Sequence, residues 1–398
     1  MNKLAGIFIF VSLLLTILSY FVNTELFLYS GLCAWGALLL LFFTINKKKM
    51  LLILFTLSAL IFSFSYLNDF SIDLKKVFTV NQYLLSLLIA VGFLRLIATP
   101  KASKVKELPS GKSSFLRTYL GIHLFGSVIN LSSLVLVADK MYKKAPLSKL
   151  QIVVLTRAFS SDAYWSPFFV AFAAALTYVP NLQTSVIVVN GLFLALIAFL
   201  LTYFESKKKF DLEKFKGYPI HFETLYLPML LALLVLITNH FRPELKVIML
   251  ISLFSLILTS IVLPLKKGIK KSILKFNEHI YEELPKMKME LGLFLVAGMF
   301  GVSISTILIG MNIVVPIDSF TYFEASILLF IFIVLAFIGI HPIITIAVIG
   351  DLMSSFNHTL LAITFLMAWS TTVSTSPFSG LNLTIQARYN VRASDIFR

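Results

Sequence analysis

AFSSDAYWSPF at residues 158–168 and AWSTTVSTSPF at residues 368–378 align with each other without a gap. Both stretches combine small hydroxyl residues with a Ser-Pro-Phe ending. Further upstream, VADKM at residues 137–141 recurs as IGDLM at residues 349–353, with nearly the same spacing between the copies. One short match in a Ser-rich chain has little weight, but two matches in the same order indicate an internal repeat.

The repeated stretches lie in an apolar chain of 398 residues, of which 58% are hydrophobic and 13% are charged. Soluble domains are near half apolar and a quarter charged, so the composition excludes a soluble enzyme, a disordered chain and a nucleic-acid-binding protein. A spanning helix needs about 20 mostly apolar residues. Uninterrupted segments of this kind lie near 4–22, 26–45, 50–67, 82–99, 184–204, 224–240, 244–264 and 290–313. The first of them is not a cleaved signal peptide, because it lacks a small-residue cleavage site and runs into another span.

Other apolar stretches are interrupted by Gly, Pro or clusters of Ser, Thr and Asn: 115–138, 151–178, 322–356 and 358–386. We interpret 115–138 and 322–356 as re-entrant hairpins, with tips at GSVIN (126–130) and GIHP (339–342), and the other two as broken spans. The predicted fold is therefore an all-α polytopic membrane protein with about ten transmembrane helices and two re-entrant hairpins in inverted repeats. Non-helical backbone inside a membrane is tolerated where it is buried in protein or lines a wet cavity. The breaks therefore mark the expected binding site.

The basic residues decide the orientation, because cytoplasmic loops carry an excess of Lys and Arg. With both hairpins returning to their own side, only Lys75, Lys76, Arg242 and Lys246 fall outside the cell, and both termini are cytoplasmic. This bias also accounts for the formal net charge of +15. The basic segment 266–288 is expected to be an interfacial helix or loop on the cytoplasmic face. The 38 phenylalanines and the preference for Lys suggest an AT-rich bacterial genome, so we expect the bacterial cytoplasmic (inner) membrane.

Asp162 is the residue most indicative of function. It lies about 16 Å along its segment by helical rise, near mid-membrane, where a carboxylate costs roughly 2.5–3.5 kcal/mol and usually faces the protein interior. It could ligate Na⁺ or carry a proton, or form a structural pair with Arg157. Arg157 could instead contact an anionic substrate or face the cytoplasmic surface.

Broken helices offer free N–H groups suited to a carboxylate and free carbonyls suited to Na⁺, and hydroxyl and amide oxygens add hard ligands. The candidate substrate- or ion-binding residues are Ser127, Asn130, Ser132, Ser133, Ser160, Ser161, Asp162, Ser166, His341, Thr345, Ser370, Thr371, Thr372, Ser374, Thr375 and Ser376. The alternative for each Ser and Thr is a hydrogen bond to its own helix backbone. His341 either shapes the second tip or transfers a proton. Asp139 and Asp351 lie near the interfaces, where capping or solvent exposure is expected.

The sequence lacks the residues that several other functions would require. Cys33 is the single cysteine, which excludes an intrachain disulfide and a Cys-based metal cluster. The six histidines show no metal-ligand spacing, and no phosphate-binding loop indicates ATP hydrolysis. An integral membrane enzyme would need an acidic pair, a nucleophile–base pair or metal ligands near one interface, and no such cluster stands out. We expect no catalytic residue, no cofactor and no metal other than Na⁺.

The order of hairpin, broken helix and span, in two inverted copies over about 115–204 and 290–398, resembles the ion transporter superfamily. That group includes divalent-anion/sodium symporters, citrate and arsenite permeases, and the large membrane subunit of TRAP transporters. Many members carry Ser-Asn-Thr at each hairpin tip, where this chain reads INLSS (129–133) and IHP (340–342). The resemblance implies that the repeats form a transport domain moving against a scaffold by an elevator mechanism, usually within a homodimer.

On this interpretation the domains are a scaffold (1–114), a first repeat (115–204), scaffold helices with a cytoplasmic amphipathic segment (205–289) and a second repeat (290–398). The expected function is secondary transport of a small organic anion, a carboxylate, coupled to Na⁺ or H⁺. The expected partners are membrane lipid and a second copy of the chain, with a partner subunit open as in TRAP systems. The alternatives are an Na⁺/H⁺ antiporter with Asp162 as the exchanging carboxylate and, less favoured, a membrane enzyme.

Overall fold

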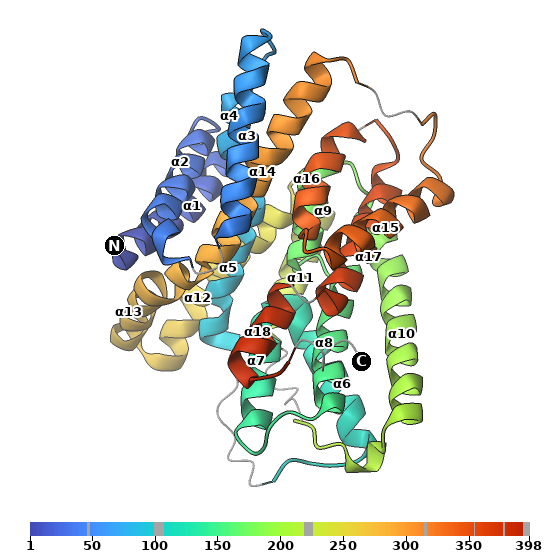
Figure 1. Ribbon diagram of the computed structural model, residues 1–398. Helices are drawn as coiled ribbons and strands as arrows, with labels where there is room; N and C mark the ends of the chain where they lie inside the picture. The colour runs from blue at the N-terminus through green and yellow to red at the C-terminus, as the bar shows by residue number, and fades with distance from the viewer. Residues whose placement is uncertain are drawn as a thin grey trace. The chain divides into compact units, whose positions relative to one another are not determined.

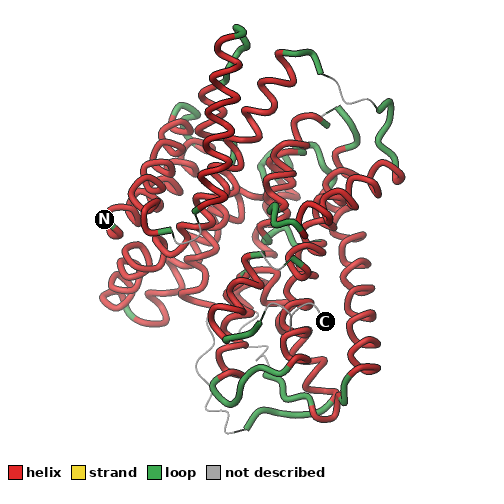
Figure 2. The backbone as a smooth tube through the Cα atoms, viewed as in Figure 1, coloured by secondary structure: helices red, strands yellow, loops and turns green. Residues whose placement is uncertain are grey.

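The computed structural model describes residues 1–45, 48–98, 107–218, 226–313, 317–353, 355–376 and 379–392. The protein is all-helical, with 81% helix and no strand in the described part (Figure 2). Within the described residues, eight helices are long and apolar enough to cross a membrane. The predicted class, a helical multi-pass membrane protein, is confirmed at this level.

The chain forms two compact units, and the first comprises residues 1–97, 231–319 and 343–356 (Figure 1). The helices that lie mainly in it are α1 (Asn2–Phe21), α2 (Leu26–Leu41), α3 (Lys49–Leu67), α4 (Leu74–Thr79), α5 (Gln82–Ala98), α11 (Tyr226–Phe241), α12 (Val247–Lys267), α13 (Ile269–Glu278), α14 (Lys288–Gly310) and α16 (Pro342–Leu352). The expected basic segment is helical: α13 continues through a π-helical turn (His279–Glu283) and a 3₁₀ turn (Leu284–Met287) into α14. Lys76 pairs with Asp351 at 2.7 Å and so joins α4 to α16.

The second unit comprises residues 98–230, 320–342 and 357–398. Its helices are α6 (Lys112–Ile129), α7 (Leu131–Tyr142), α8 (Lys149–Ser160), η2 (Ser161–Tyr164), α9 (Val170–Tyr178), α10 (Thr184–Lys209), η3 (Leu212–Lys214), α15 (Tyr322–Phe337), α17 (His358–Thr375) and α18 (Gly380–Tyr389). α17 packs against α8, η2, α9 and α15, and α6 packs against α7, α8 and η2. The predicted second repeat is thus distributed over both units, since α15 lies in this unit and α16 in the other.

The interrupted segments break where their polar residues lie. α6 ends at Ile129, and its C-cap Asn130 has a positive φ of +52°, which is uncommon for a residue other than glycine. α8 begins with a capping box between Ser148 and Gln151 and ends at Ser160. In the second copy, Asn357 caps α17 and Ser379 caps α18. Pro377 and Phe378 of the repeated pattern lie outside the described residues.

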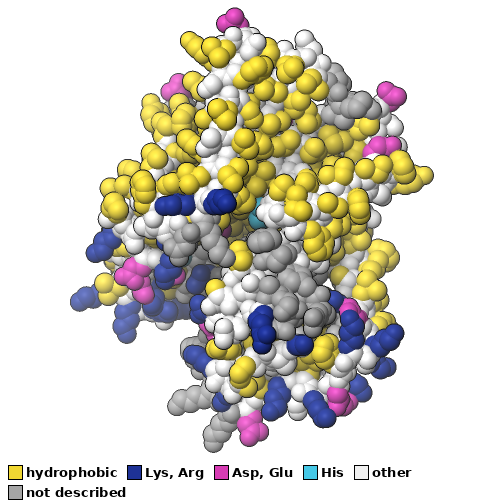
Figure 3. Space-filling view, viewed as in Figure 1, with side chains coloured by type: hydrophobic (Ala, Val, Ile, Leu, Met, Phe, Trp, Pro, Cys, Tyr) yellow, Lys and Arg dark blue, Asp and Glu magenta, His cyan; other side chains and the backbone are white. Residues whose placement is uncertain are grey.

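Apolar side chains cover much of the face seen in Figure 3. In α10 only 17% of the most apolar window is buried inside the structure, and in α3 only 22%. A helix whose apolar residues point outward is stable where lipid replaces water around it. These exposed helices therefore fit a protein surrounded by a bilayer.

Candidate functional site

The first break, from Ser161 to Phe169, holds a completely buried carboxylate. α8 gives way there to the 3₁₀ turn η2, and Asp162 is its second residue, with 0% of its surface exposed. The Asp162 carbonyl accepts the backbone N–H groups of Trp165 at 3.3 Å and Ser166 at 3.0 Å. This tight turn fixes the position of Asp162 relative to the indole ring that follows it.

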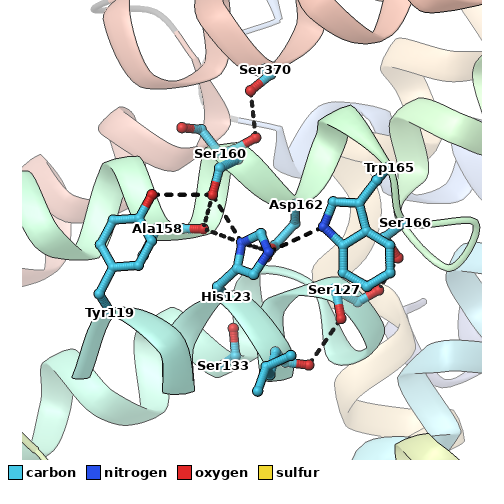
Figure 4. A network of polar contacts seen from close by, with 12 residues as sticks. Tyr119, His123, Ser127, Ser133, Ala158, Ser160, Asp162, Trp165, Ser166 and Ser370 are labelled. Atoms are coloured by element: carbon cyan, nitrogen blue, oxygen red, sulfur yellow. Dashed lines mark hydrogen bonds and ion pairs between the residues drawn. The ribbon is translucent and has the colours of Figure 1, made fainter. Parts of the chain in front are cut away.

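His123 of α6 is the partner of Asp162 (Figure 4). Its Nδ1 lies 2.7 Å from Asp162 Oδ1, and it also lies 2.9 Å from Ser161 Oγ and 3.3 Å from the Ala158 carbonyl. The indole N–H of Trp165 donates to His123 Nε2 at 3.1 Å. A buried carboxylate and the partly buried imidazole and indole rings, from α6 and the break, therefore form one polar network.

Two glycines provide the space for this network. A Cβ at Gly126 of α6 would lie 2.0 Å from Asp162 Oδ2, and a Cβ at Gly191 of α10 would lie 2.2 Å from the Tyr164 carbonyl oxygen. Real Cβ atoms do not approach other atoms this closely. The absence of side chains at these positions lets α6 contact the carboxylate and α10 contact the break.

The two copies of the repeated pattern make matching contacts. Ser166 Oγ donates to the Ser127 carbonyl at 2.5 Å, and Ser376 Oγ donates to the Ala336 carbonyl at 2.8 Å. In both copies a break serine is thus bonded to the end of a preceding helix, α6 in one copy and α15 in the other. Ser370 Oγ also donates at 2.7 Å to the carbonyl of Ser160, its equivalent 210 residues earlier.

Near the second break, one amide and one hydroxyl side chain bond carbonyl groups at the end of α17. Asn382 Nδ2 lies 3.0 Å from the Ser374 carbonyl and 2.9 Å from the Ser376 carbonyl, and Ser379 Oγ donates to the Val373 carbonyl at 2.7 Å. These bonds satisfy carbonyl groups that the end of α17 leaves free. Asn382 and Ser379 were absent from the predicted site, although a polar residue after a helix break is a usable signal.

Many of the predicted hydroxyls bond to their own helix, which is the alternative that the sequence left open. These are Ser127, Ser133, Ser160, Thr372, Ser374 and Thr375. Thr371 supplies the carbonyl that accepts from Ser374 and Thr375. The side chain of Ser132 lies outside the described residues.

The residues predicted at the hairpin tips are divided between the two units. Asn130 Nδ2 donates to the Phe168 carbonyl at 3.3 Å, which ties the first tip to the first break. His341 packs edge-on against Trp369 of α17, with 5.2 Å between the ring centroids, and lines a small hollow with Thr372 and Ser376. Thr345 is buried in α16, in the other unit.

Arg157 does not pair with Asp162. Its guanidinium donates to Glu205 of α10 at 2.5 Å, and Glu205 also accepts from Lys209 at 2.8 Å. Positions five residues apart are not on the same face of a helix with 3.6 residues per turn, so Arg157 turns toward α10 while Asp162 turns toward α6. The structural pair that we considered from the sequence is therefore replaced by Asp162–His123.

Asp139 is an ion-pair residue rather than a cap. Both of its carboxylate oxygens accept from Arg388 at 2.7 Å, and Tyr389 Oη donates to Oδ1 at 2.9 Å, which joins α7 to α18. Hydrogen bonding to Arg388 holds the pKa of Asp139 below its ordinary value. Asp351 likewise pairs, with Lys76.

His123 is the residue of the candidate site that the sequence interpretation missed. The histidines were searched for metal-ligand spacing, whereas the informative feature of His123 is an ionisable side chain inside an apolar segment. Among the described residues, no group of three or more His, Cys, Asp and Glu could hold a metal ion. The chain matches no protein-family model, and a comparison with curated proteins finds no match.

Proposed function

We propose that this protein is a secondary active transporter that couples the movement of a small organic anion, a carboxylate, to a cation, Na⁺ or H⁺. The observation that carries the proposal is Asp162, a carboxylate with no exposed surface in a helix break of a membrane protein, whose partner is the imidazole of His123. A buried carboxylate in an apolar surrounding is costly unless a ligand or a proton neutralises it. Reversible neutralisation of such a group is what cation coupling requires.

The matching contacts of the two breaks support a transporter built from repeats. Ser166 and Ser376 occupy equivalent positions and bond equivalent helices, and the Ser370–Ser160 bond joins the copies at equivalent residues. Equivalent residues contact each other where a pseudo-symmetry axis passes between two copies. We propose that the copies are inverted in the membrane, as in many secondary transporters, and that they move by an elevator mechanism.

The ends of the broken helices support the proposed substrate class. α9 begins at Val170 and α18 at Gly380, each directly after a break. The first N–H groups of a helix carry a partial positive charge and favour a carboxylate. The proposal also includes a homodimer in a bacterial cytoplasmic membrane, without a catalytic activity.

The test uses purified protein and thermal unfolding with a panel of di- and tricarboxylates, in Na⁺ or K⁺ and at two pH values. A ligand that binds only the folded state at 100 times its Kd stabilises by about 2.7 kcal/mol. We expect a carboxylate-dependent shift that depends on Na⁺ or pH and loses this dependence in Asp162→Asn. Thr372→Val, at the equivalent position of the second copy, is the matched control and keeps the dependence. A shift from Na⁺ and pH alone would favour an antiporter, and no shift with any ligand would contradict the proposal.

A further inference from the structure

The carboxylate of Asp162 lacks the hydrogen bonds that a buried charge needs. Neither of its oxygens has a partner in hydrogen-bond geometry among the described residues. Oδ1 lies within ion-pair distance of His123 Nδ1, but the well-directed contact of that nitrogen is with Ser161 Oγ at 2.9 Å. Oδ2 faces Gly126. A carboxylate with 0% exposure and an unpartnered oxygen is an incomplete site for a neutralising ligand.

The hydrogen bond from Trp165 determines the charge of His123. An indole N–H only donates, so His123 Nε2, which it contacts at 3.1 Å, is an acceptor without a proton. The ring proton is therefore on Nδ1, which faces the oxygens of Ala158, Ser161 and Asp162. In this arrangement the imidazole is neutral and brings no full positive charge to Asp162.

The ionisable groups on α6 and on the elements packed against α6 and η2 are Lys112, Arg117 and Tyr119 on α6; Asp139, Lys140 and Tyr142 on α7; Lys149 and Arg157 on α8; Tyr164 on η2; Tyr178 on α9; Tyr203, Glu205, Lys207, Lys208 and Lys209 on α10; Glu213 and Lys214 on η3; and His358 on α17.

None of these groups forms an ion pair with Asp162 in the described part of the chain, where its ion-pair contact is His123. Arg157 is engaged by Glu205 at 2.5 Å, and Lys112 by Glu213 at 2.8 Å. Arg117 is nearly two helical turns before His123, about 9 Å along the α6 axis. An ionised Asp162 would therefore leave the network with an uncompensated negative charge.

We propose that the coupling ion is a proton, which binds Asp162 at Oδ2, and that Trp165 is a positioning residue that directs the proton there by keeping His123 neutral. The role of this proton in transport rests on the proposed function. A hard cation takes several oxygen ligands, whereas no described hydroxyl or amide hydrogen-bonds to Oδ2, and Gly126 closes one side of it. A proton needs only the carboxylate oxygen itself.

The geometry also connects proton binding to the backbone of the break. Trp165 donates its backbone N–H to the Asp162 carbonyl and its indole N–H to His123, so one residue joins the carboxylate turn to α6. A second proton on His123 would occupy Nε2 and oppose the indole N–H. Protonation of His123 therefore requires the contact between Trp165 and α6 to open, while protonation of Asp162 leaves that contact intact.

Infrared spectroscopy of the full-length protein in lipid tests the proton directly, without a substrate. We expect the carbonyl band of a protonated, buried carboxylic acid, which disappears as the pH rises and is absent in Asp162→Asn. Asp139→Asn, which removes a carboxylate held by Arg388, is the control and keeps the band. A band that is absent at every pH at which the protein is folded would overturn the proposal, as would a band that Asp162→Asn retains.

Nitrogen NMR of histidine-labelled protein tests the role of Trp165. In the wild type we expect His123 to remain neutral with its proton on Nδ1, and in Trp165→Phe we expect it to become an imidazolium in the same titration. Trp369→Phe, which alters the ring beside His341, is the matched control and leaves His123 unchanged. An imidazolium at His123 in the wild type would refute the role of Trp165, even if the phenylalanine variant does not fold.

The two proposals fail in different ways. If the infrared band is present but no carboxylate stabilises the protein, then the substrate class is wrong and the proton site stands. If carboxylates stabilise the protein in a Na⁺-dependent manner and Asp162 is ionised throughout, then transport stands and the proton is not the coupling ion.

Discussion

The two helix breaks make the same kind of serine-to-backbone hydrogen bond and differ in charge. In each, a serine directly before the repeated proline position bonds the end of a preceding helix. The first break contains Asp162, with His123 as its partner. In the second copy the position of Asp162 is occupied by Thr372, whose hydroxyl bonds the Trp369 carbonyl of its own helix.

This difference in charge indicates that the two copies have different roles. In the second break Asn382 donates to the Ser374 and Ser376 carbonyls, and the neutral Thr372 stands in place of Asp162; Asn382 Oδ1 has no hydrogen-bond partner among the described residues. In the first break a carboxylate remains without well-directed hydrogen bonds. A break by itself is thus a structural feature that a membrane protein can stabilise, and we propose that the buried carboxylate adds a site for a coupling ion.

The largest expected effect is that of Asp162→Asn, which removes the charge and keeps the shape. We expect it to abolish the pH dependence of carboxylate binding, because Asn does not titrate between the charged and neutral forms. Thr372→Val removes only a hydroxyl bonded to its own helix and should leave the dependence intact. The readout is the carboxylate-induced change in unfolding temperature at two pH values. Equal effects of the two substitutions would remove the functional distinction between the breaks.

Gly126→Ala should have the next largest effect, which is a loss of stability. The new methyl group would lie 2.0 Å from Asp162 Oδ2 and 3.1 Å from the Phe159 ring. Overpacking of this kind destabilises by about 1–3 kcal/mol. Gly380→Ala at the start of α18 is the control, because no atom of another part of the described chain lies within 4 Å of the added carbon, and we expect a change within about 0.5 kcal/mol. Thermal unfolding in detergent measures both, and a harmless Gly126→Ala would contradict the close approach of α6 to the carboxylate.

Ser166→Ala and Ser376→Ala test what the breaks have in common. Each removes a buried hydroxyl and its hydrogen bond to a helix-end carbonyl, a bond that contributes about 0.5–1.5 kcal/mol. Because the contacts are equivalent, the losses of stability should be equal within about 0.5 kcal/mol. The comparison of the two unfolding curves decides this, and a loss confined to one variant would argue against equivalent breaks.

Asp139→Asn is expected to have the smallest effect on stability. The pair with Arg388 is partly exposed, so it contributes less than about 1 kcal/mol. The folded-state pKa of Asp139 lies below its ordinary value because of the hydrogen bonds from Arg388. Its contribution is therefore complete above the unfolded pKa of about 3.9 and is lost as the pH falls through the folded pKa. Unfolding curves of the wild type and the variant should converge in acid, and a gap that widens there would contradict this pair.

The sequence predicted the elements of this comparison better than their contacts. The interruptions, the helical class and the burial of Asp162 follow from local composition, because apolar runs and charges within them have meaning in a membrane without tertiary information. The partner of Asp162 depends on how α6 is rotated against the break, and the partner of Arg157 lies on α10, 48 residues away. No local sequence pattern specifies the partner of Asp162 or the partner of Arg157. The separation of α15 and α16 into different units likewise leaves no signal in the segment 322–356.

Uptake into proteoliposomes tests the central claim most directly. Liposomes containing the protein would be given an inward pH gradient, or an inward Na⁺ gradient at equal pH, with the labelled carboxylate that gives the largest stabilisation. The account predicts accumulation driven by the pH gradient in the wild type and in Thr372→Val, and none in Asp162→Asn. Accumulation that Asp162→Asn retains in full would contradict it.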